Sequence, residues 1–335
     1  MALNNVQGFW PVVAALVGNV FITGIKFFAA LVSGSSSMLS EAIHSFADTI
    51  NQVLLLIGLR RSTKEADDTF EYGYGNERFF WALISACGVL FVGAGITGYN
   101  GISALTDPHH VEFSAIVFIV LLVSLVVESY TFLVAARSLK AHLPHVSWRE
   151  RLSRADPSTL AVYLEDAVAV IGILVASLSI TLSYYTDDPV WDAIGSMIIA
   201  LLLGAVAVGL ILKNRSYLIG RSMPETLQEK VVAFLRGEPV VEKVIDFKSM
   251  AVGFGVYRIK CEIEFNGSAL LREAYQMQTL REEFGEVNGD FEAFKRFCVD
   301  YADRIPRLIG RKIDDIETRL RKIHPNIRHI DIEVN

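Results

Sequence analysis

A histidine and a carboxylate stand one helical turn apart inside an apolar stretch of this sequence. His44 and Asp48 are spaced i, i+4, so a helix places both on one face. A later apolar stretch holds two adjacent carboxylates, Glu165 and Asp166. Buried carboxylates repel one another unless they are protonated or bridged by a cation, and imidazole with carboxylate oxygens suits a divalent transition metal, typically zinc. The four residues therefore predict a metal or proton site.

Two further polar residues are candidates for accessory or proton-relay roles. Asn51 lies about one turn beyond Asp48 and offers an oxygen to the same site. Glu128 is an isolated acid in another apolar stretch, where ionisable side chains are costly and usually functional. We expect Glu128 to act either as a proton relay or as the partner of Lys26, and the sequence does not decide between these roles.

The elements that position these residues are membrane helices. Of the 335 residues, 52% are hydrophobic and only 20% are charged, which is the composition of a membrane protein. Six apolar stretches are long enough to cross about 30 Å of hydrocarbon. They lie near Phe9–Val32, Met38–Leu59, Phe79–Ile102, Phe113–Ala136, Thr159–Tyr184 and Val190–Leu212. We predict six transmembrane helices in a transport domain of residues 1–219.

The last third of the chain has the pattern of a soluble α+β domain, residues 220–335. The expected order is a helix, two strands, a long charged helical region that is broken near Asn288, and a last strand. These elements are expected near Pro224–Leu235, Val241–Lys248, Val256–Phe265, 269–323 and Arg328–Val334. Asn266-Gly267 is expected to form a turn after the second strand. The fold class is thus an α-helical membrane protein with a C-terminal cytoplasmic α+β domain.

The charge distribution predicts the orientation and excludes one class of partner. A net charge of −6 without a basic stripe argues against nucleic acid binding. Twelve Lys and Arg residues lie in the second-to-third link, in the fourth-to-fifth link and after the sixth stretch, whereas the other links hold none. This asymmetry places both termini in the cytoplasm. The three cysteines form no CxxC pair, so no thiolate metal site is expected.

Several motifs resemble those of one transporter family. The run Ser35-Ser-Ser-Met-Leu-Ser-Glu41-Ala-Ile-His44-Ser-Phe-Ala-Asp48 is similar to the second-helix signature of the cation diffusion facilitators, which are metal/proton antiporters. The resemblance extends over essentially the whole chain. The motifs Asp156-Pro-Ser-Thr, Leu218-Ile-Gly-Arg-Ser222 and His324-Pro-Asn-Ile-Arg-His329 look like the branch that contains zinc transporter nine, in the form of a prokaryotic-type relative.

The resemblance implies a ligand set and an assembly. His44, Asp48 and Asp166 match the metal ligands of the family, whereas Val162 stands where the family usually has a fourth His or Asp. We expect Glu165 to replace that ligand, and a water or Asn51 is the alternative. A set rich in carboxylates is harder, which favours manganese or iron slightly more than a histidine-rich set does. The family also implies a homodimer joined through the cytoplasmic domains, in a bacterial inner membrane.

The expected function is antiport of a divalent metal against protons. Zn²⁺ is the first candidate for the transported ion, and Mn²⁺, Fe²⁺ and Co²⁺ are the others; no organic cofactor is expected. Histidine and carboxylates bind metal when deprotonated, so metal and protons exchange at the site as alternating access moves metal out of the cytoplasm. Two alternatives stay open. One is a membrane-embedded metalloenzyme with Glu165 or Glu128 as base, and the other is a metal-responsive scaffold that uses a helical insertion at about residues 275–307.

Overall fold

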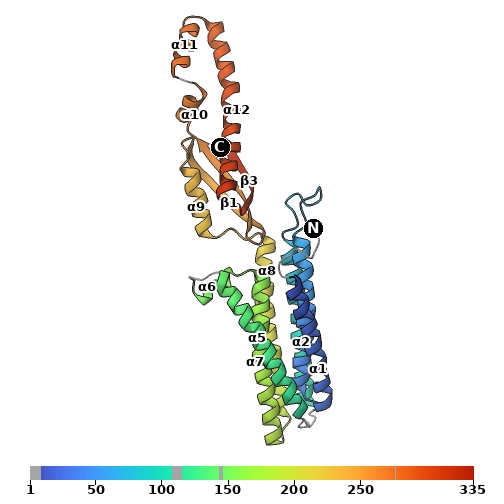
Figure 1. The fold of residues 1–335 in the computed structure, drawn as a ribbon. Helices are drawn as coiled ribbons and strands as arrows, with labels where there is room; N and C mark the ends of the chain where they lie inside the picture. The colour runs from blue at the N-terminus through green and yellow to red at the C-terminus, as the bar shows by residue number, and fades with distance from the viewer. Residues whose placement is uncertain (1–8, 108–114, 143–145, 276) are drawn as a thin grey trace. The chain divides into compact units, whose positions relative to one another are not determined.

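The structure is a computed structural model that describes residues 9–107, 115–142, 146–275 and 277–335. The chain forms two compact units, one of Met1–Thr69 and Gly73–Ile219 and the other of Phe70–Tyr72 and Gly220–Asn335. The first unit is entirely helical in its described residues (Figure 1). Its helices are α1 (Phe9–Ser33), α2 (Ser36–Ser62), α3 (Glu77–Gly88), η2 (Val89–Ile96), α4 (Thr97–Thr106), α5 (Ala115–His142), α6 (Trp148–Arg154), α7 (Pro157–Thr186) and α8 (Val190–Ile219).

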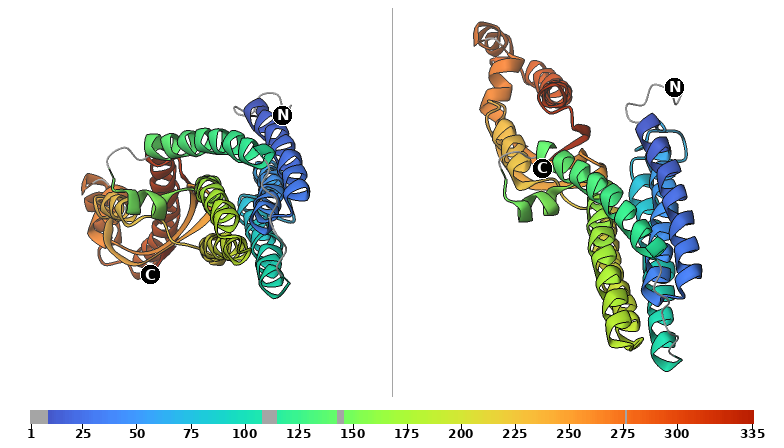
Figure 2. Two further views of the ribbon diagram at one scale, coloured as in Figure 1. Left: turned by 90° about the horizontal axis from the view of Figure 1, so that it is seen from below. Right: turned by 60° about the horizontal axis from the view of Figure 1, so that its bottom comes forward.

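The helices of the first unit have the length and composition of membrane spans. Within the described residues, five are long and apolar enough to cross a bilayer, namely α2, the continuous helix Glu77–Thr106, α5, α7 and α8. The helix α1 adds a shorter apolar segment, Asn19–Ser33. The predicted α-helical membrane fold is therefore confirmed. Figure 2 shows α7 and α8 side by side along their lengths, with α5 lying across α7.

Local sequence signals set the ends of the helices that carry the polar residues. Ser35 caps α2, because its Oγ accepts a hydrogen bond from the Met38 amide at 3.1 Å. Asp156 caps α7, which begins with Pro157, a residue suited to the first helical position. Asp156 also pairs with Arg78 of α3 at 2.9 Å, so one carboxylate ties the starts of two helices together.

The third membrane helix contains a π-helical segment that the sequence did not predict. The segment η2 separates α3 from α4 and includes Gly93 and Gly95. A Cβ at Gly93 would lie 3.6 Å from the Ala47 Cβ of α2, and a Cβ at Gly98 would lie 3.6 Å from the Ala200 Cβ of α8. The glycines therefore let this helix approach both neighbours closely, as small residues do between membrane helices.

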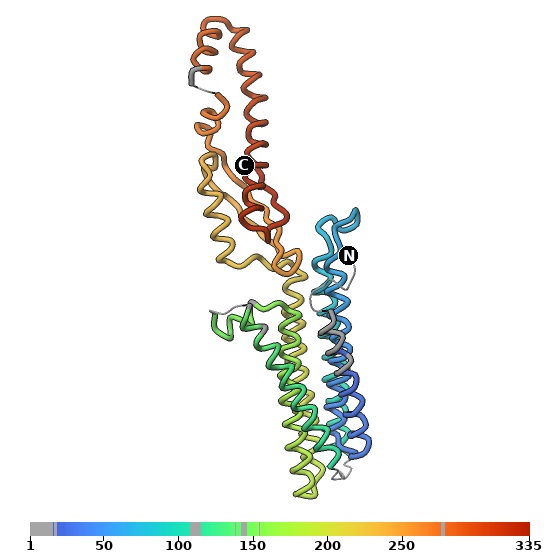
Figure 3. The backbone as a smooth tube through the Cα atoms, viewed as in Figure 1, coloured from blue at the N-terminus to red at the C-terminus, as the bar shows by residue number. Residues whose placement is uncertain are grey.

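The second unit is a two-layer α+β domain. It contains α9 (Glu225–Arg236), β1 (Val241–Gly253), β2 (Val256–Phe265), α10 (Gly267–Ala274), α11 (Met277–Val287), α12 (Phe291–Ile323) and β3 (Ile327–Val334). The sheet order is β1-β2-β3, with β1 antiparallel and β3 parallel to β2. The parallel pair needs a crossover, which α10 to α12 supply. Figure 3 shows α11 folding back along the first half of α12.

One layer of that domain is helical and packs on the central strand. Val231 and Leu235 of α9 and Ile316 of α12 share a buried cluster with Ile259 and Ile263 of β2. The predicted turn at Asn266-Gly267 is wrong. Asn266 instead caps α10, because its side chain accepts a hydrogen bond from the Ala269 amide at 3.0 Å, so the strand passes directly into a helix. The predicted break near Asn288 is present between α11 and α12.

Close packing of α7 on α8 yields a test of the bundle. A Cβ at Gly195 of α8 would overlap the Ser179 side chain of α7, whereas a Cβ at Gly209 of the same helix would meet nothing within 4 Å. Overpacking of this kind costs about 1 to 3 kcal/mol. We expect Gly195→Ala to lower the melting temperature of the full-length protein in nanodiscs by several degrees, and Gly209→Ala to leave it unchanged or raise it. Equal effects of the two substitutions would contradict this packing.

Candidate metal site in the transmembrane bundle

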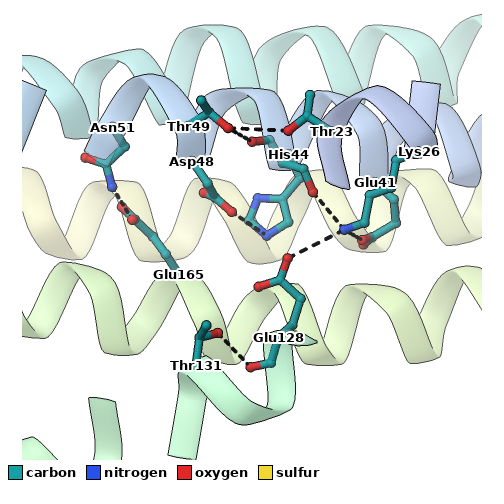
Figure 4. A network of polar contacts seen from close by, with 11 residues as sticks. Thr23, Lys26, Glu41, His44, Asp48, Thr49, Asn51, Glu128, Thr131 and Glu165 are labelled. Atoms are coloured by element: carbon teal, nitrogen blue, oxygen red, sulfur yellow. Dashed lines mark hydrogen bonds and ion pairs between the residues drawn. The ribbon is translucent and has the colours of Figure 1, made fainter. Parts of the chain in front are cut away.

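One face of α2 carries a continuous series of buried polar side chains. Glu41, His44, Asp48 and Asn51 follow one another at intervals of three or four residues, which places them on the same side of the helix. All four are buried. Figure 4 shows Glu41 and Asn51 joined to partners on neighbouring helices, Lys26 and Glu165, and His44 and Asp48 joined to each other. The face of α2 that the sequence singled out is therefore the face that packs into the bundle.

His44 and Asp48 lie together as their spacing predicts. His44 Nε2 is 3.5 Å from Asp48 Oδ2, and the imidazole is completely buried. Neither nitrogen of His44 makes a hydrogen bond, and Asp48 Oδ1 makes none. Buried polar atoms are normally hydrogen-bonded, because leaving them unpaired is costly. This pair thus has free ligand atoms that a proton or a metal ion would satisfy.

The two acids of α7 turn toward different helices. Glu165 accepts a short hydrogen bond from Asn51 Nδ2 of α2, and Asn51 Oδ1 accepts one from Ser85 of α3. Asp166 instead interacts with Glu128 and the Thr131 hydroxyl, both on α5, and its Oδ2 has no hydrogen-bond partner. Consecutive helical residues project about 100° apart, and here the two carboxylates face different neighbours.

The predicted ligands form one electrostatic cluster without forming a closed coordination shell. Asp48 is acted on by the charges of Glu165, Glu128 and Asp166. However, within the described residues no three His, Cys, Asp or Glu side chains are grouped closely enough to hold a metal ion. Val162, one turn before Asp166, offers no ligand atom. The structure thus brings His44 and Asp48 together and holds Glu165 one turn further along α2, at Asn51.

A lysine on α1 contacts the N-terminal end of the polar series of α2, at Glu41. Lys26 is completely buried, and its Nζ lies 3.1 Å from Glu41 Oε2 and 2.7 Å from Ser45 Oγ. Its Nζ is also 3.8 Å from Glu128 Oε1 (Figure 4). Glu128 is therefore a partner of Lys26, which was one of the two roles expected for it.

Asp192 is a buried acid that sequence reasoning missed. It lies in the first turn of α8 with 2% of its surface exposed. Its carboxylate accepts hydrogen bonds from Ser35 Oγ at 2.8 Å and from the Ser36 amide at 2.5 Å, and it also bonds to Ser37. An acid is favourable at a helix N-terminus, so Asp192 caps α2 from a different helix. Its position inside the last apolar stretch was the available signal.

Comparisons with known proteins identify the family of the chain. Residues 12–219 match the cation efflux transmembrane domain family. Metal tolerance protein C4 of Arabidopsis thaliana is 36% identical over 345 residues, covering 99% of this chain and 75% of that protein. The human proton-coupled zinc antiporter SLC30A9, mitochondrial, is 34% identical over 315 residues, covering 92% of this chain and 55% of that protein. Cation-efflux pump FieF of Shewanella oneidensis is 26% identical over 256 residues, covering 76% of this chain and 80% of that protein.

This chain spans about half the length of the human relative and three quarters of the plant relative. The family match covers the helical unit from residue 12 to residue 219, including the helices that carry His44, Asp48 and Asp166. The resemblance found in the sequence motifs is thereby confirmed, including its branch. The chain is a multi-pass membrane protein and belongs to the cation efflux family, the cation diffusion facilitators, whose members carry metal cations.

Proposed function

We propose that this protein exchanges a divalent transition metal for protons across a membrane and that Zn²⁺ is its physiological cargo. The observation that carries the proposal is the buried His44–Asp48 pair, whose ring nitrogens and Oδ1 have no hydrogen-bond partner. Imidazole and carboxylate ligands suit zinc. The name of the human relative, a proton-coupled zinc antiporter, supports the same cargo and the same counter-ion.

The proposed ligands are His44 and Asp48 of α2 with Asp166 and Glu165 of α7. Glu165 takes the place of the ligand that Val162 cannot supply, and it has to exchange its hydrogen bond with Asn51 for the metal. That exchange couples metal binding to the packing of α7 on α2. Asn51 and Glu128 are accessory groups outside the ligand set: Asn51 donates a hydrogen bond to Glu165, and Glu128 pairs with Lys26.

Proton coupling follows from the chemistry of these ligands. A histidine or carboxylate binds metal only in its deprotonated form, so metal entry from the cytoplasm displaces protons from the site. When the site faces the opposite compartment, protons at higher concentration compete the metal off. Alternating access thus moves metal out of the cytoplasm as protons move in, with Mn²⁺, Fe²⁺ and Co²⁺ as competing cargoes that the same donor atoms accept.

Membership of a transporter family decides against the enzyme alternative. The relatives are named as a tolerance protein, an antiporter and an efflux pump. A metalloenzyme would need a substrate carbonyl or phosphoryl group at the metal, whereas a transporter needs ligands that can open to both sides. We therefore assign the His44 site to metal translocation and no enzymatic role to Glu165 or Glu128.

Zinc flux into proteoliposomes under an imposed pH gradient tests the function directly. We expect wild-type protein to transport Zn²⁺ in a gradient-dependent manner and Asp48→Ala to reduce the rate at least 100-fold. Glu165→Gln should reduce the rate at least tenfold if Glu165 is the fourth ligand, because an amide is a weaker metal ligand than a carboxylate. Flux is measured with a zinc-sensitive dye trapped in the vesicles.

The matched control is Asp68→Ala, which removes an exposed carboxylate in the link between α2 and α3. This variant should transport zinc at the wild-type rate. Absence of zinc and manganese flux in folded wild-type protein would contradict the transporter proposal. Unchanged flux in Glu165→Gln would instead leave the fourth position to water or Asn51.

We also propose that both termini and the second unit lie on the cytoplasmic side of a bacterial inner membrane. The asymmetry of Lys and Arg among the links supports this orientation. The human relative is named as mitochondrial, and the matrix is the equivalent side in that organelle.

Cys298 is a natural reporter of this orientation. Its thiol is exposed on α12, whereas Cys261 is buried in the sheet, where burial raises the pKa of the thiol to about 12 and keeps it protonated and unreactive. We expect a membrane-impermeant maleimide to label the protein in inverted vesicles but not in right-side-out vesicles. Cys298→Ser should abolish the labelling, and labelling of right-side-out vesicles would reverse the proposed orientation.

We propose in addition that residues 220–335 form a dimerisation domain, which includes the helical hairpin at about residues 275–307. Family resemblance supports a homodimer, and the face of the sheet opposite α9 and α12 carries partly exposed charged residues of both signs, such as Lys260, Glu262 and Asp331. Mass photometry of the protein in nanodiscs should give two chains of 37.1 kDa each. A single chain per particle at all protein concentrations would contradict the dimer.

A further inference from the structure

A second buried ion cluster lies beside the proposed metal site and is not part of its ligand set. It consists of Lys26, Glu41 and Glu128, contributed by α1, α2 and α5. The side chains of Lys26 and Glu41 are both completely buried, and that of Glu128 is 9% exposed. Ser45 supplies a further oxygen to the ammonium at 2.7 Å. Glu41 lies one turn before His44 on α2, so the two clusters are neighbours (Figure 4).

The ammonium of Lys26 lies next to the proposed metal site. Its Nζ bonds at 2.7 Å to the hydroxyl of Ser45, the residue that follows His44. At this position its charge acts on both His44 and Asp48. The other charged groups that act on Asp48 are three carboxylates, those of Glu165, Glu128 and Asp166. In the low-dielectric interior of a bundle, such interactions are far stronger than in water. A divalent cation at His44 and Asp48 therefore meets attraction from the acids and repulsion from one fixed ammonium.

The Lys26–Glu41 ion pair is expected to add little to the stability of the helix packing. The cost of removing two charges from water offsets most of their attraction, so a buried pair is a weak stabiliser compared with apolar side chains of the same size. Glu41 Oε1 also has no hydrogen-bond partner. It lies against Gly172 of α7, where a Cβ would overlap it. The cluster thus places incompletely paired charge next to the helix that carries Glu165 and Asp166.

We propose that Lys26 is a tethered counter-cation, held by Glu41 and Glu128, that lowers the affinity of the adjacent site for metal and so permits release. The inference rests on the proposed metal site at His44 and Asp48. Lys26 is a positioning residue: its ammonium is bonded to Glu41, Ser45 and Glu128, and it acts on the cargo through space. Glu41 compensates its charge, so the Lys26–Glu41 pair sets how strongly the metal is repelled.

The proposal requires opposite effects from removing the two members of the pair. We expect Lys26→Met to bind Zn²⁺ about tenfold more tightly, because a repelling charge is lost next to the site. Glu41→Gln should bind Zn²⁺ about tenfold more weakly, because the ammonium is then less compensated. The double variant Lys26→Met/Glu41→Gln, in which one charge of each sign is removed, should return to within about threefold of wild type. Lys26→Arg, which keeps the charge, should stay close to wild type.

Equilibrium zinc titration of the full-length protein in nanodiscs at one fixed pH measures these affinities, and stopped-flow release of zinc to a chelator measures the rates. Lys26→Met should release zinc more slowly than wild type. Melting curves without metal report whether each variant is folded. If Lys26→Met does not fold, Glu41→Gln and the double variant still test the proposal. The double variant must then restore the zinc affinity that Glu41→Gln has lost.

Two outcomes separate failure of this inference from failure of the proposed function. If wild type and Asp48→Ala bind zinc equally, the metal site itself is refuted. If Asp48→Ala loses binding while Lys26→Met and Glu41→Gln both weaken it, the cluster only supports the bundle and the counter-cation role is overturned. A double variant weaker than Glu41→Gln alone would overturn it in the same way.

Discussion

The structure depends on how negative charge is accommodated inside an apolar bundle. The buried or half-buried carboxyl groups within its described helices include those of Glu41, Asp48, Glu128, Glu165 and Asp166. Each charge would be very costly in isolation. The bundle supplies Lys26 to Glu41 and Glu128, and Asn51 to Glu165. Asp48 has the imidazole of His44 as its neighbour, and that pairing leaves one of its oxygens without a hydrogen bond.

Through these pairings, α2 makes polar contacts with several neighbouring helices of the bundle. Its N-terminus is capped by Asp192 of α8, its middle meets Lys26 of α1, and its Asn51 meets Glu165 of α7. Apolar packing alone fixes the rotation of a membrane helix poorly, because lipid is as apolar as the interface. Polar contacts with three different helices define that rotation. They therefore fix which side chains the helix presents to its neighbours.

The sequence predicted the parts of this arrangement that depend on local spacing. The i, i+4 relation of His44 and Asp48 follows from helical geometry, and the six apolar stretches follow from composition. The direction of Glu165 could not be predicted, because it depends on Asn51, which is itself held by Ser85 from a third helix. Asp192 was overlooked because its partners are backbone and serine groups more than 150 residues away in the chain. The π-helical segment has no local sequence signal that we recognise.

The division of the α7 acids between two helices bears on transport itself. Glu165 faces α2 and Asp166 faces α5, so an ion that binds both has to draw the two neighbouring helices toward one point. A divalent ion can be bound by both acids at once, whereas a proton neutralises one acid and does not require the two helices to converge. Metal and protons would then stabilise different helix arrangements at the same residues. A ligand shifts a conformational equilibrium only through such a difference in affinity between two states, and here that difference follows from the positions of two adjacent side chains.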